Sequence, residues 1–339
     1  MSEKVPEIRI VGGASTEKKA EVRESLEQAF SNHLESTSPQ ELEQLRKLEY
    51  PKSETELALI NFANEETSRL MQEAGVEPYD IPVENFHIIP PELYKKVADK
   101  NSAASAFNMQ QGIIFNAEYF RDNPVYFCDN AIHEILHLKA HFSVEVEEEN
   151  GEVKKTPYRE GVSVRAIQKD GFNGRYHMHF NGLHEAIVSE TEKRFLSKLL
   201  DVPVLAKERE WLESDEAKEL KKKLSDKKKI PEDDIVWIGN KGENDWEIIT
   251  YARQREVLNF VCAEIQKQFP DKYQSADEVY KVFLNAHFTG KLLELARLVD
   301  GTFGEGSFRL LGNMTTDKES GVLTYEALKK ARVRQLKKN

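Results

Sequence analysis

The segment that most constrains the fold is residues 123–141, NPVYFCDNAIHEILHLKAH, which reads as a single helix with two different faces. A buried apolar stripe is predicted by four residues spaced three or four apart, Val125, Cys128, Ile132 and Leu136. Ionisable groups interrupt this run at His133, Glu134 and His137. The segment is therefore either a metal-binding helix or a core helix on which histidines occur by chance.

The HExxH spacing has a mechanical meaning on a helix. His133 and His137 are four residues apart, so their side chains leave the same face about one turn from each other. Two imidazoles placed in this way can converge on one zinc ion at about 2.0–2.1 Å. Glu134 projects from a neighbouring direction and can act as general base on a zinc-bound water. The pattern predicts Zn2+ as cofactor, and a chance motif without metal is the alternative.

His141 is not expected to be a ligand. On a continuing helix it lies about 12 Å from His133 along the axis, too far for both imidazoles to meet one ion. The metzincin pattern, which needs a Gly and a further His after the second His, also fails, since Ala140 and Ser143 occupy those positions. A surface or helix-end position is predicted for His141.

A catalytic zinc ion needs a third protein ligand, and NGLHEAIVSE (181–190) supplies the best candidate. With HExxH upstream, the chain resembles the gluzincin class of zinc metallopeptidases, the thermolysin-like group. In that class a ligating Glu stands on a second helix, often within an N-E-A/G motif, and His184-Glu185-Ala186 matches it with His in place of Asn. The resemblance implies that His133, His137 and Glu185 bind zinc.

The same resemblance implies that Glu134 is the base, and the whole chain resembles bacterial predicted metallopeptidases that carry a helical region after the second zinc helix. Taken alone, Glu185 is equally an acid favoured by the helix dipole near an N-terminus. His184 and Glu190 remain alternative ligands.

The sequence departs from the gluzincin pattern in two ways. The gap from His137 to Glu185 is 48 residues, longer than in the best-known members of the class. Ser189 stands where an acid four residues after the ligand is expected to orient a zinc-binding histidine. The residue that orients the histidines is therefore left open.

Groups that could stabilise an oxyanion are candidates only. RYHMHF places His177 and His179 on one face of a predicted strand, and His179 is a candidate donor, with a structural role as the alternative. Tyr251 begins the C-terminal helical region and is a second candidate, since that region can fold back over the cleft. Arg253 and Arg255 are more commonly salt-bridge residues, and His287 in NAHFTG reads as a helix-end residue.

The order of predicted elements indicates an α+β fold of zincin-like type. Residues 1–200 are expected to form the catalytic domain, with a small mixed sheet, the HExxH helix and the second zinc-ligand helix. A charged helix and linker are expected at 201–248, and a mainly helical region at 249–339. Strands are predicted at 83–89, within 104–117, and about an Asn150-Gly151 hairpin, and helices at 16–30, 39–48, 53–74 and 182–200.

Charge and composition narrow the range of partners. A net charge of −11 argues against general binding of nucleic acid or anionic membranes, and the lysine-rich runs at 221–229 and 327–338 read as solvated helix faces or loops. No run approaches the roughly 18 apolar residues of a membrane span, and the N-terminus lacks an apolar signal core. Two distant cysteines, Cys128 and Cys262, favour a reducing cytoplasm over a disulfide framework.

The sequence thus predicts zinc-dependent hydrolysis of peptide bonds in a peptide or protein substrate, with Glu134 activating the water. A non-catalytic, zinc-stabilised protein-interaction module is the alternative. The strand before the HExxH helix, within ASAFNMQQGIIFNA, either pairs with an extended peptide by β-augmentation or is an ordinary sheet strand. Substrate preference and oligomeric state are left open.

Overall fold

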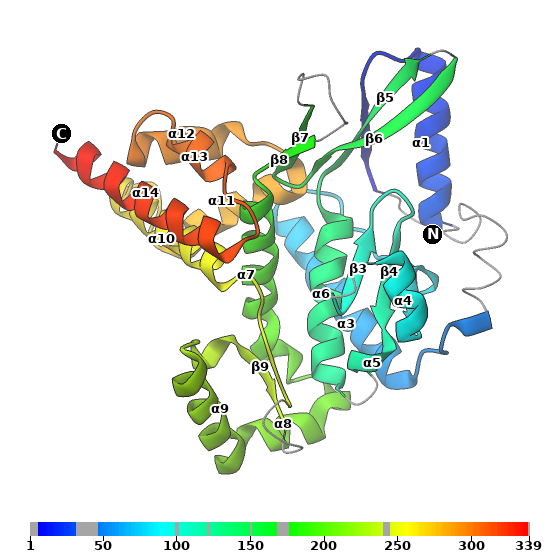
Figure 1. The fold of residues 1–339 in the computed structure, drawn as a ribbon, viewed down its shortest axis with the longest axis vertical. Helices are drawn as coiled ribbons and strands as arrows, with labels where there is room; N and C mark the ends of the chain where they lie inside the picture. The colour runs from blue at the N-terminus through cyan, green and yellow to red at the C-terminus, as the bar shows by residue number, and fades with distance from the viewer. Residues whose placement is uncertain are drawn as a thin grey trace.

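Two long helices, α6 (Pro124–Lys139) and α7 (Asn181–Leu199), run side by side through the centre of the molecule and contact each other (Figure 1). The structure is a computed structural model. It describes residues 6–31, 47–98, 102–120, 123–149, 151–167, 176–239 and 245–337. The sheets and the C-terminal helices are arranged around this central pair.

Local sequence explains where α6 begins. The side chain of Asn123 caps the helix by accepting a hydrogen bond from the Tyr126 amide at 3.0 Å, and Pro124 occupies the first turn, where no amide donor is needed. The predicted apolar stripe is buried, with Val125, Cys128, Ile132 and Leu136 each at most 1% exposed. The predicted amphipathic helix is confirmed, and the opposite face is left for the histidines.

A three-stranded sheet lies against α6. Its order is β2-β4-β3, with β2 (Phe86–Ile89) parallel to β4 (Gly112–Asn116) and β3 (Ala104–Phe107) antiparallel to β4. The predicted pair of strands about a turn is confirmed, while residues 83–85 of the predicted first strand form a 3-10 helix. β3 is the edge strand and contacts α6, so its free edge is available beside the central helix.

Helix α3 (Glu54–Glu73) packs on the other side of α6. It starts with the predicted capping box, in which Ser53 and Glu56 satisfy each other's backbone amides. Short helices α4 (Pro91–Val97) and α5 (Ala117–Phe120) flank the small sheet. Of the helix predicted at 39–48, residues 39–46 lie outside the described part of the chain.

The second sheet has five strands in the order β1-β5-β6-β7-β8. β1 (Ile8–Val11) is parallel to β5 (Phe142–Glu149) and is followed by α1 (Thr16–Ser31), whereas β6 (Glu152–Glu160), β7 (Ser163–Ile167) and β8 (Tyr176–His179) continue antiparallel. The predicted hairpin is present, because Glu149 pairs with Glu152 and Gly151 has a φ of +82°. Asn150 lies outside the described residues.

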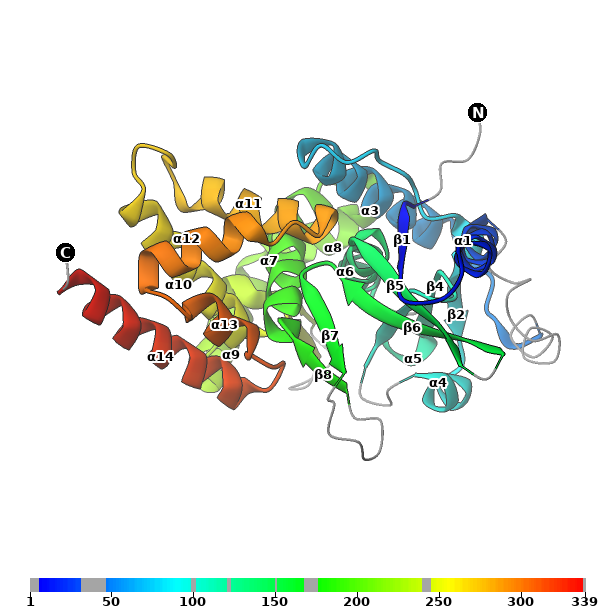
Figure 2. The same cartoon turned by 90° about the horizontal axis from the view of Figure 1, so that it is seen from above.

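The rest of the chain continues from the end of α7, and part of it packs back against this helix (Figures 1 and 2). After the 3-10 turn at Pro203–Leu205 come α8 (Ala206–Glu213), α9 (Asp215–Lys228), β9 (Ile235–Ile238) and β10 (Trp246–Ile248). The helices that follow are α10 (Ala252–Gln268), α11 (Ala276–Thr289), α12 (Leu293–Phe303), α13 (Ser307–Gly312) and α14 (Lys318–Leu336). The main hydrophobic cluster runs from Leu59 to Ala331, so these helices share one core with α6 and α7.

The architecture is α+β, as predicted, with small mixed sheets and many helices. Cys128 and Cys262 are both buried and free. None of the described helices combines the length and the apolar character needed to cross a lipid bilayer.

Candidate metal centre

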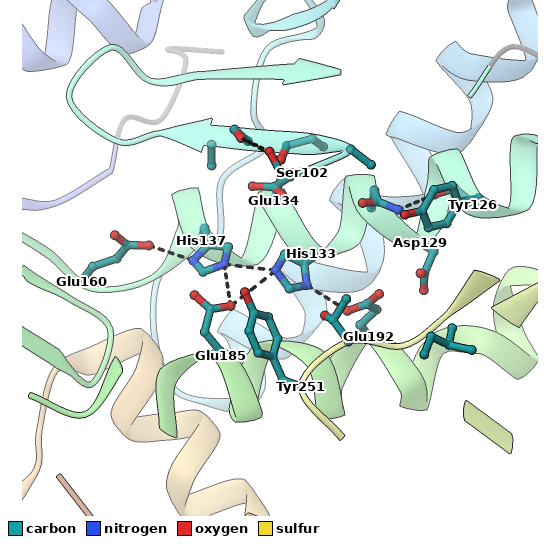
Figure 3. A pocket seen from close by; sticks show the side chains of 17 residues that line it. Ser102, Tyr126, Asp129, His133, Glu134, His137, Glu160, Glu185, Glu192 and Tyr251 are labelled. Atoms are coloured by element: carbon teal, nitrogen blue, oxygen red, sulfur yellow. Dashed lines mark hydrogen bonds and ion pairs between the residues drawn. The ribbon is translucent and has the colours of Figure 1, made fainter. Parts of the chain in front are cut away.

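Three side chains from α6 and α7 converge where the two helices face each other (Figure 3). The Nε2 atoms of His133 and His137 are 3.3 Å apart, and Glu185 Oε2 lies 3.6 Å from each of them. The three side chains are only 12–13% exposed. The structure thus brings together the residues that the sequence predicted as ligands, although Glu185 comes 48 residues after the second histidine along the chain.

These separations match what a tetrahedral zinc ion requires. Ligand atoms about 2.05 Å from the metal, at tetrahedral angles, lie about 3.3 Å from one another. The observed values of 3.3, 3.6 and 3.6 Å are close to this spacing. An ion at the common point has three protein ligands and one open position, which is the arrangement of catalytic rather than structural zinc sites.

The far ring nitrogens of both histidines are held by carboxylates. His133 Nδ1 lies 2.8 Å from Glu192 Oε2, and His137 Nδ1 lies 2.8 Å from Glu160 Oε1. A carboxylate at Nδ1 accepts a hydrogen bond from the ring, which assigns the proton to Nδ1 and directs the Nε2 lone pair at the common point. The two acids fix the orientation that metal binding needs.

Glu185 Oε2 is buried and has no hydrogen-bond partner among the described residues. Two imidazole lone pairs and this carboxylate oxygen therefore face one another, an arrangement that is costly unless a proton or a cation lies between them. Burial disfavours the charged form of Glu185 and would raise its pKa. The contacts with His137 and His133 outweigh this effect and hold the pKa of Glu185 well below its usual range. Oε2 is thus ready to ligate at neutral pH.

The histidines show the complementary effect. Burial alone lowers the pKa of His133, but the Glu192 and Glu185 carboxylates raise it to about 10. The pKa of His137 is likewise raised well above its ordinary value, because Glu185 and Glu160 outweigh the loss of solvation. Without a metal the cluster therefore holds protons, and a divalent cation must displace them in order to bind.

Glu134 stands beside the ligands without belonging to their set. Its side chain is 8% exposed and points from α6 toward β3, where the Ala106 backbone lies within hydrogen-bonding reach (Figure 3). Burial raises the pKa of Glu134, and the neighbouring histidines act in the opposite direction. A carboxyl with a raised pKa next to a metal position is suited to taking up and returning a proton.

The centre opens into a cleft of about 510 Å³. Its walls are β3 with the residues just before it, one face of α6 from Tyr126 to His137, the facing side of α7, and the segment that leads into α10. The lining residues are Ser102–Ala106, Tyr126, Asp129, Asn130, His133, Glu134, His137, Glu160, Glu185, Glu192, Ile248, Thr250 and Tyr251. The free edge of β3 therefore runs along the wall opposite the ligands.

Tyr251 reaches the centre from the C-terminal region, as the sequence suggested. Its ring stacks on the His133 imidazole, with centroids 6.4 Å apart and planes at 20°, and it lines the cleft. The residue precedes α10 in a left-handed conformation, with a φ of 54°. Burial, together with Glu185 and Glu134, raises the pKa of Tyr251, so its hydroxyl stays protonated and can donate a hydrogen bond.

His179 is not brought to the centre. It lies on β8, stacks edge-on with His177 at 4.4 Å, and contacts Asn313 and Arg309 rather than any residue that lines the cleft. His179 is therefore not among the described residues that line the cleft, since β8 is the strand of the five-stranded sheet farthest in pairing order from β5, and its oxyanion role stays a prediction without support from this geometry. The structural role that the sequence also allowed fits its position.

The alternative ligands have other partners. His184 Nε2 lies 3.3 Å from Glu160 Oε1, which accepts hydrogen bonds from His184 and His137 together. Glu190 lies beside Arg194 and Asn259, and Ser189 is 3.3 Å from the Thr250 hydroxyl. His184 therefore shares the Glu160 carboxylate with His137, on the side of His137 that is turned away from the metal position. Glu190 also faces away from that position.

Four further residues that the sequence singled out lie away from the ligands. His287 is buried, donates a hydrogen bond from Nε2 to the Leu136 carbonyl at 3.1 Å, and stacks on His184 at 5.1 Å. Arg255 is bound to Asp234, and Arg253 pairs with Glu256. His141 lies beyond the end of α6, as expected, and its ring fills the space beside Gly290.

Glu160 and Glu192 were not predicted. Glu192 is seven residues after Glu185 on α7, two turns along the same face, so helix periodicity contained the signal. Glu160 ends β6, and no local spacing relates it to His137.

Close packing behind Glu160 depends on Gly161. This residue has a φ of +54°, and a Cβ at this position would lie 2.7 Å from His184 Nδ1 and 2.8 Å from His287 Nδ1. Its amide donates to the His141 carbonyl at 2.7 Å. Only glycine meets both requirements, the left-handed backbone and the contact with two imidazoles.

Comparison of the chain with known protein families, with curated proteins and with solved structures gave no match. The functional assignment therefore depends on the geometry of the centre.

Proposed function

We propose that this chain is a zinc-dependent peptidase with a zincin-like arrangement of the active site. The observation that carries the proposal is the convergence of His133, His137 and the unpartnered Glu185 Oε2 at tetrahedral spacing, beside the separate carboxyl of Glu134 in an open cleft. A structural zinc site is closed by four protein ligands and has no use for an adjacent base. The cleft has both the open position and the base.

The roles of the residues follow from their positions. The bound ion supplies Lewis-acid chemistry, activating water and polarising the carbonyl of the substrate. Glu134 takes a proton from the attacking water and returns it to the leaving amine. Tyr251, protonated and stacked on His133, donates a hydrogen bond to the developing oxyanion. Glu192 and Glu160 keep the two imidazoles in the ligating orientation.

The free edge of β3 supports a peptide as substrate. Residues 102–106 line the cleft along this edge, and β3 pairs with β4 on its other side only. An extended chain can add to such an edge through main-chain hydrogen bonds. In a peptide bound in this way, we expect the scissile carbonyl to lie between Glu134 and the ligands.

Two variants test the proposal. Glu134→Gln is expected to keep one equivalent of Zn2+ and lose hydrolysis, because only the base is removed. His137→Ala is expected to lose both metal and hydrolysis. Metal content is measured by elemental analysis and activity with a peptide library. Full activity of Glu134→Gln would refute the mechanism, and a wild type that binds Zn2+ but cleaves no peptide would instead support the zinc-stabilised interaction module.

A further inference from the structure

The cleft continues past His133 toward the start of α6, and this end is acidic. Asp129 stands one turn before His133 on α6, and Glu192 faces it from α7 (Figure 3). Glu247 on β10, next to the lining residue Ile248, is close enough for its charge to act on Asp129 and on the Tyr126 hydroxyl. Among the residues that line the cleft in the described part of the chain, five are carboxylic acids and none is Lys or Arg.

Four of the five acids have a task at the metal centre. Glu185 is a ligand, Glu134 the base, and Glu160 and Glu192 orient the histidines. Asp129 has none of these tasks, although it is 1% exposed and lines the cleft. A carboxyl group buried to this extent without a function in folding or chemistry is costly.

Asp129 is also incompletely satisfied. Its Oδ1 is buried and has no hydrogen-bond partner in the described structure, while the carboxyl group contacts that of Glu192. Burial and the closeness of Glu192 raise the pKa of Asp129 well above its ordinary value. Two carboxyl groups in contact need a proton or another cation to share.

No cation of the described chain fills this role. Arg255 is a basic residue whose charge acts on Asp129 and favours its ionised form. Its two terminal nitrogens bind Asp234 at 3.0 and 2.7 Å, and its Nε donates to the Thr250 carbonyl at 3.1 Å. The guanidinium is thus bound to Asp234 and Thr250, and the His133 imidazole lies against Glu192, so neither group binds the buried Oδ1 of Asp129.

We propose that Asp129, Glu192 and Glu247 form a subsite for a cationic group of the substrate, either a Lys or Arg side chain or a free α-ammonium. The inference builds on the proposed peptidase function and adds the class of substrate. A primary ammonium carries three donors, so it can bind the free Asp129 Oδ1 and a neighbouring carboxylate oxygen together. Charge-assisted hydrogen bonds of this kind are the stronger ones in proteins.

Binding is measured first, so that the result does not depend on turnover. The probes are N-acetylated, C-amidated hexapeptides of alanine with one lysine moved through the six positions, each matched by a norleucine peptide of similar shape. Affinity for zinc-loaded Glu134→Gln is followed by isothermal titration calorimetry. At one or two positions, the lysine peptide is expected to bind about 10- to 100-fold tighter than its norleucine partner, and high salt is expected to reduce this ratio.

The same set without the N-acetyl group separates the two sources of the cation. If the subsite takes a free α-ammonium, removal of the acetyl group increases affinity by a similar factor and the position of lysine has no effect. Equal affinity for lysine, norleucine, acetylated and free peptides overturns the proposal. The wild type then shows separately whether any peptide is cleaved, so the failure of the subsite and the failure of the peptidase function are distinct results.

Variants of the subsite residues test whether these residues cause the preference for lysine peptides. Asp129→Asn and Glu247→Gln, each made in the Glu134→Gln background, are expected to reduce the ratio of lysine to norleucine affinity at least about fivefold. Since Glu247 lies on β10 rather than on the ligand helices, its variant remains informative if Asp129→Asn fails to fold. Glu326→Gln, which removes an exposed charge on α14, serves as the matched control. Retention of the full ratio in both subsite variants overturns the assignment.

Discussion

Removing the carboxylate behind His133 tests whether the geometry of the centre serves metal binding. Glu192→Gln keeps the shape of the side chain, and the amide oxygen can still accept the hydrogen bond from His133 Nδ1 that Glu192 accepts at 2.8 Å. The tautomer of His133 is therefore retained. What is lost is the negative charge that makes the imidazole a more basic ligand.

Two features set the magnitude. Loss of a carboxylate that orients a ligating histidine typically weakens metal affinity by roughly 10- to 100-fold, or about 1.4–2.7 kcal/mol. Glu192 also contacts the buried Asp129 carboxyl, and relief of that contact partly offsets the loss. We therefore expect a Zn2+ affinity about tenfold weaker, near the lower end of the range.

The assay is competition for Zn2+ with a chromophoric chelator at fixed pH. Glu190→Gln is the matched control, because Glu190 is on the same helix and equally buried but faces Arg194 and Asn259. Its affinity is expected to equal that of the wild type. Circular dichroism of all three proteins checks that the helices are intact.

An unchanged affinity in Glu192→Gln, with the fold intact, would refute the reasoning. It would mean that the Nε2 atoms do not bind the metal in the orientation that the structure shows. An equal loss in Glu190→Gln would point to a general effect of charge on α7 rather than to the contact with His133.

Three other outcomes are expected. The pKa of His133 without metal is about 10, so a proton must leave when Zn2+ binds. In the chelator assay between pH 6.5 and 8.5, Zn2+ affinity should therefore rise by about tenfold per pH unit for each proton displaced. A flat profile would contradict proton displacement. Tyr251→Phe should lower kcat about 10- to 100-fold with little change in KM if its hydroxyl serves the oxyanion, and equal kcat would remove that role. Burial lowers the pKa of Lys139 from its ordinary 10.5 to about 7, so between these values the unfolded chain binds more protons and the free energy of unfolding should rise with pH by up to about 1.4 kcal/mol per unit. In denaturant titrations, Lys139→Met should lack this rise, and the same slope in both proteins would refute it.

The parts of the centre that local spacing determines could be predicted from the sequence. His133 and His137 share a face because they are one helical turn apart, and the apolar stripe of α6 fixes which face is turned inward. Glu185 could be proposed because the motif at 184–187 resembles a known pattern. The structure brings the three together, but binding of zinc by them stays a prediction.

The parts that depend on long-range packing could not. Glu160 reaches His137 only because β6 ends beside the C-terminal half of α6, which depends on the pairing of five strands. His179 was misplaced for the same reason, since its strand pattern was recognised but the position of that strand in the sheet was not encoded locally. Tyr251 was named because a returning helical region was expected, and its distance from His133 could be known only from the fold.

The glycine after Glu160 has a consequence for recognising related chains. A HExxH pattern occurs by chance in many unrelated sequences, and a glutamate on a later helix adds little discrimination. A Glu-Gly pair at the end of a strand, followed about two dozen residues later by His-Glu, is a much rarer combination, because a separate steric or electrostatic constraint fixes each of these residues. Homologues that share this centre should therefore retain Glu160-Gly161 as a fingerprint even where the rest of the sequence has diverged.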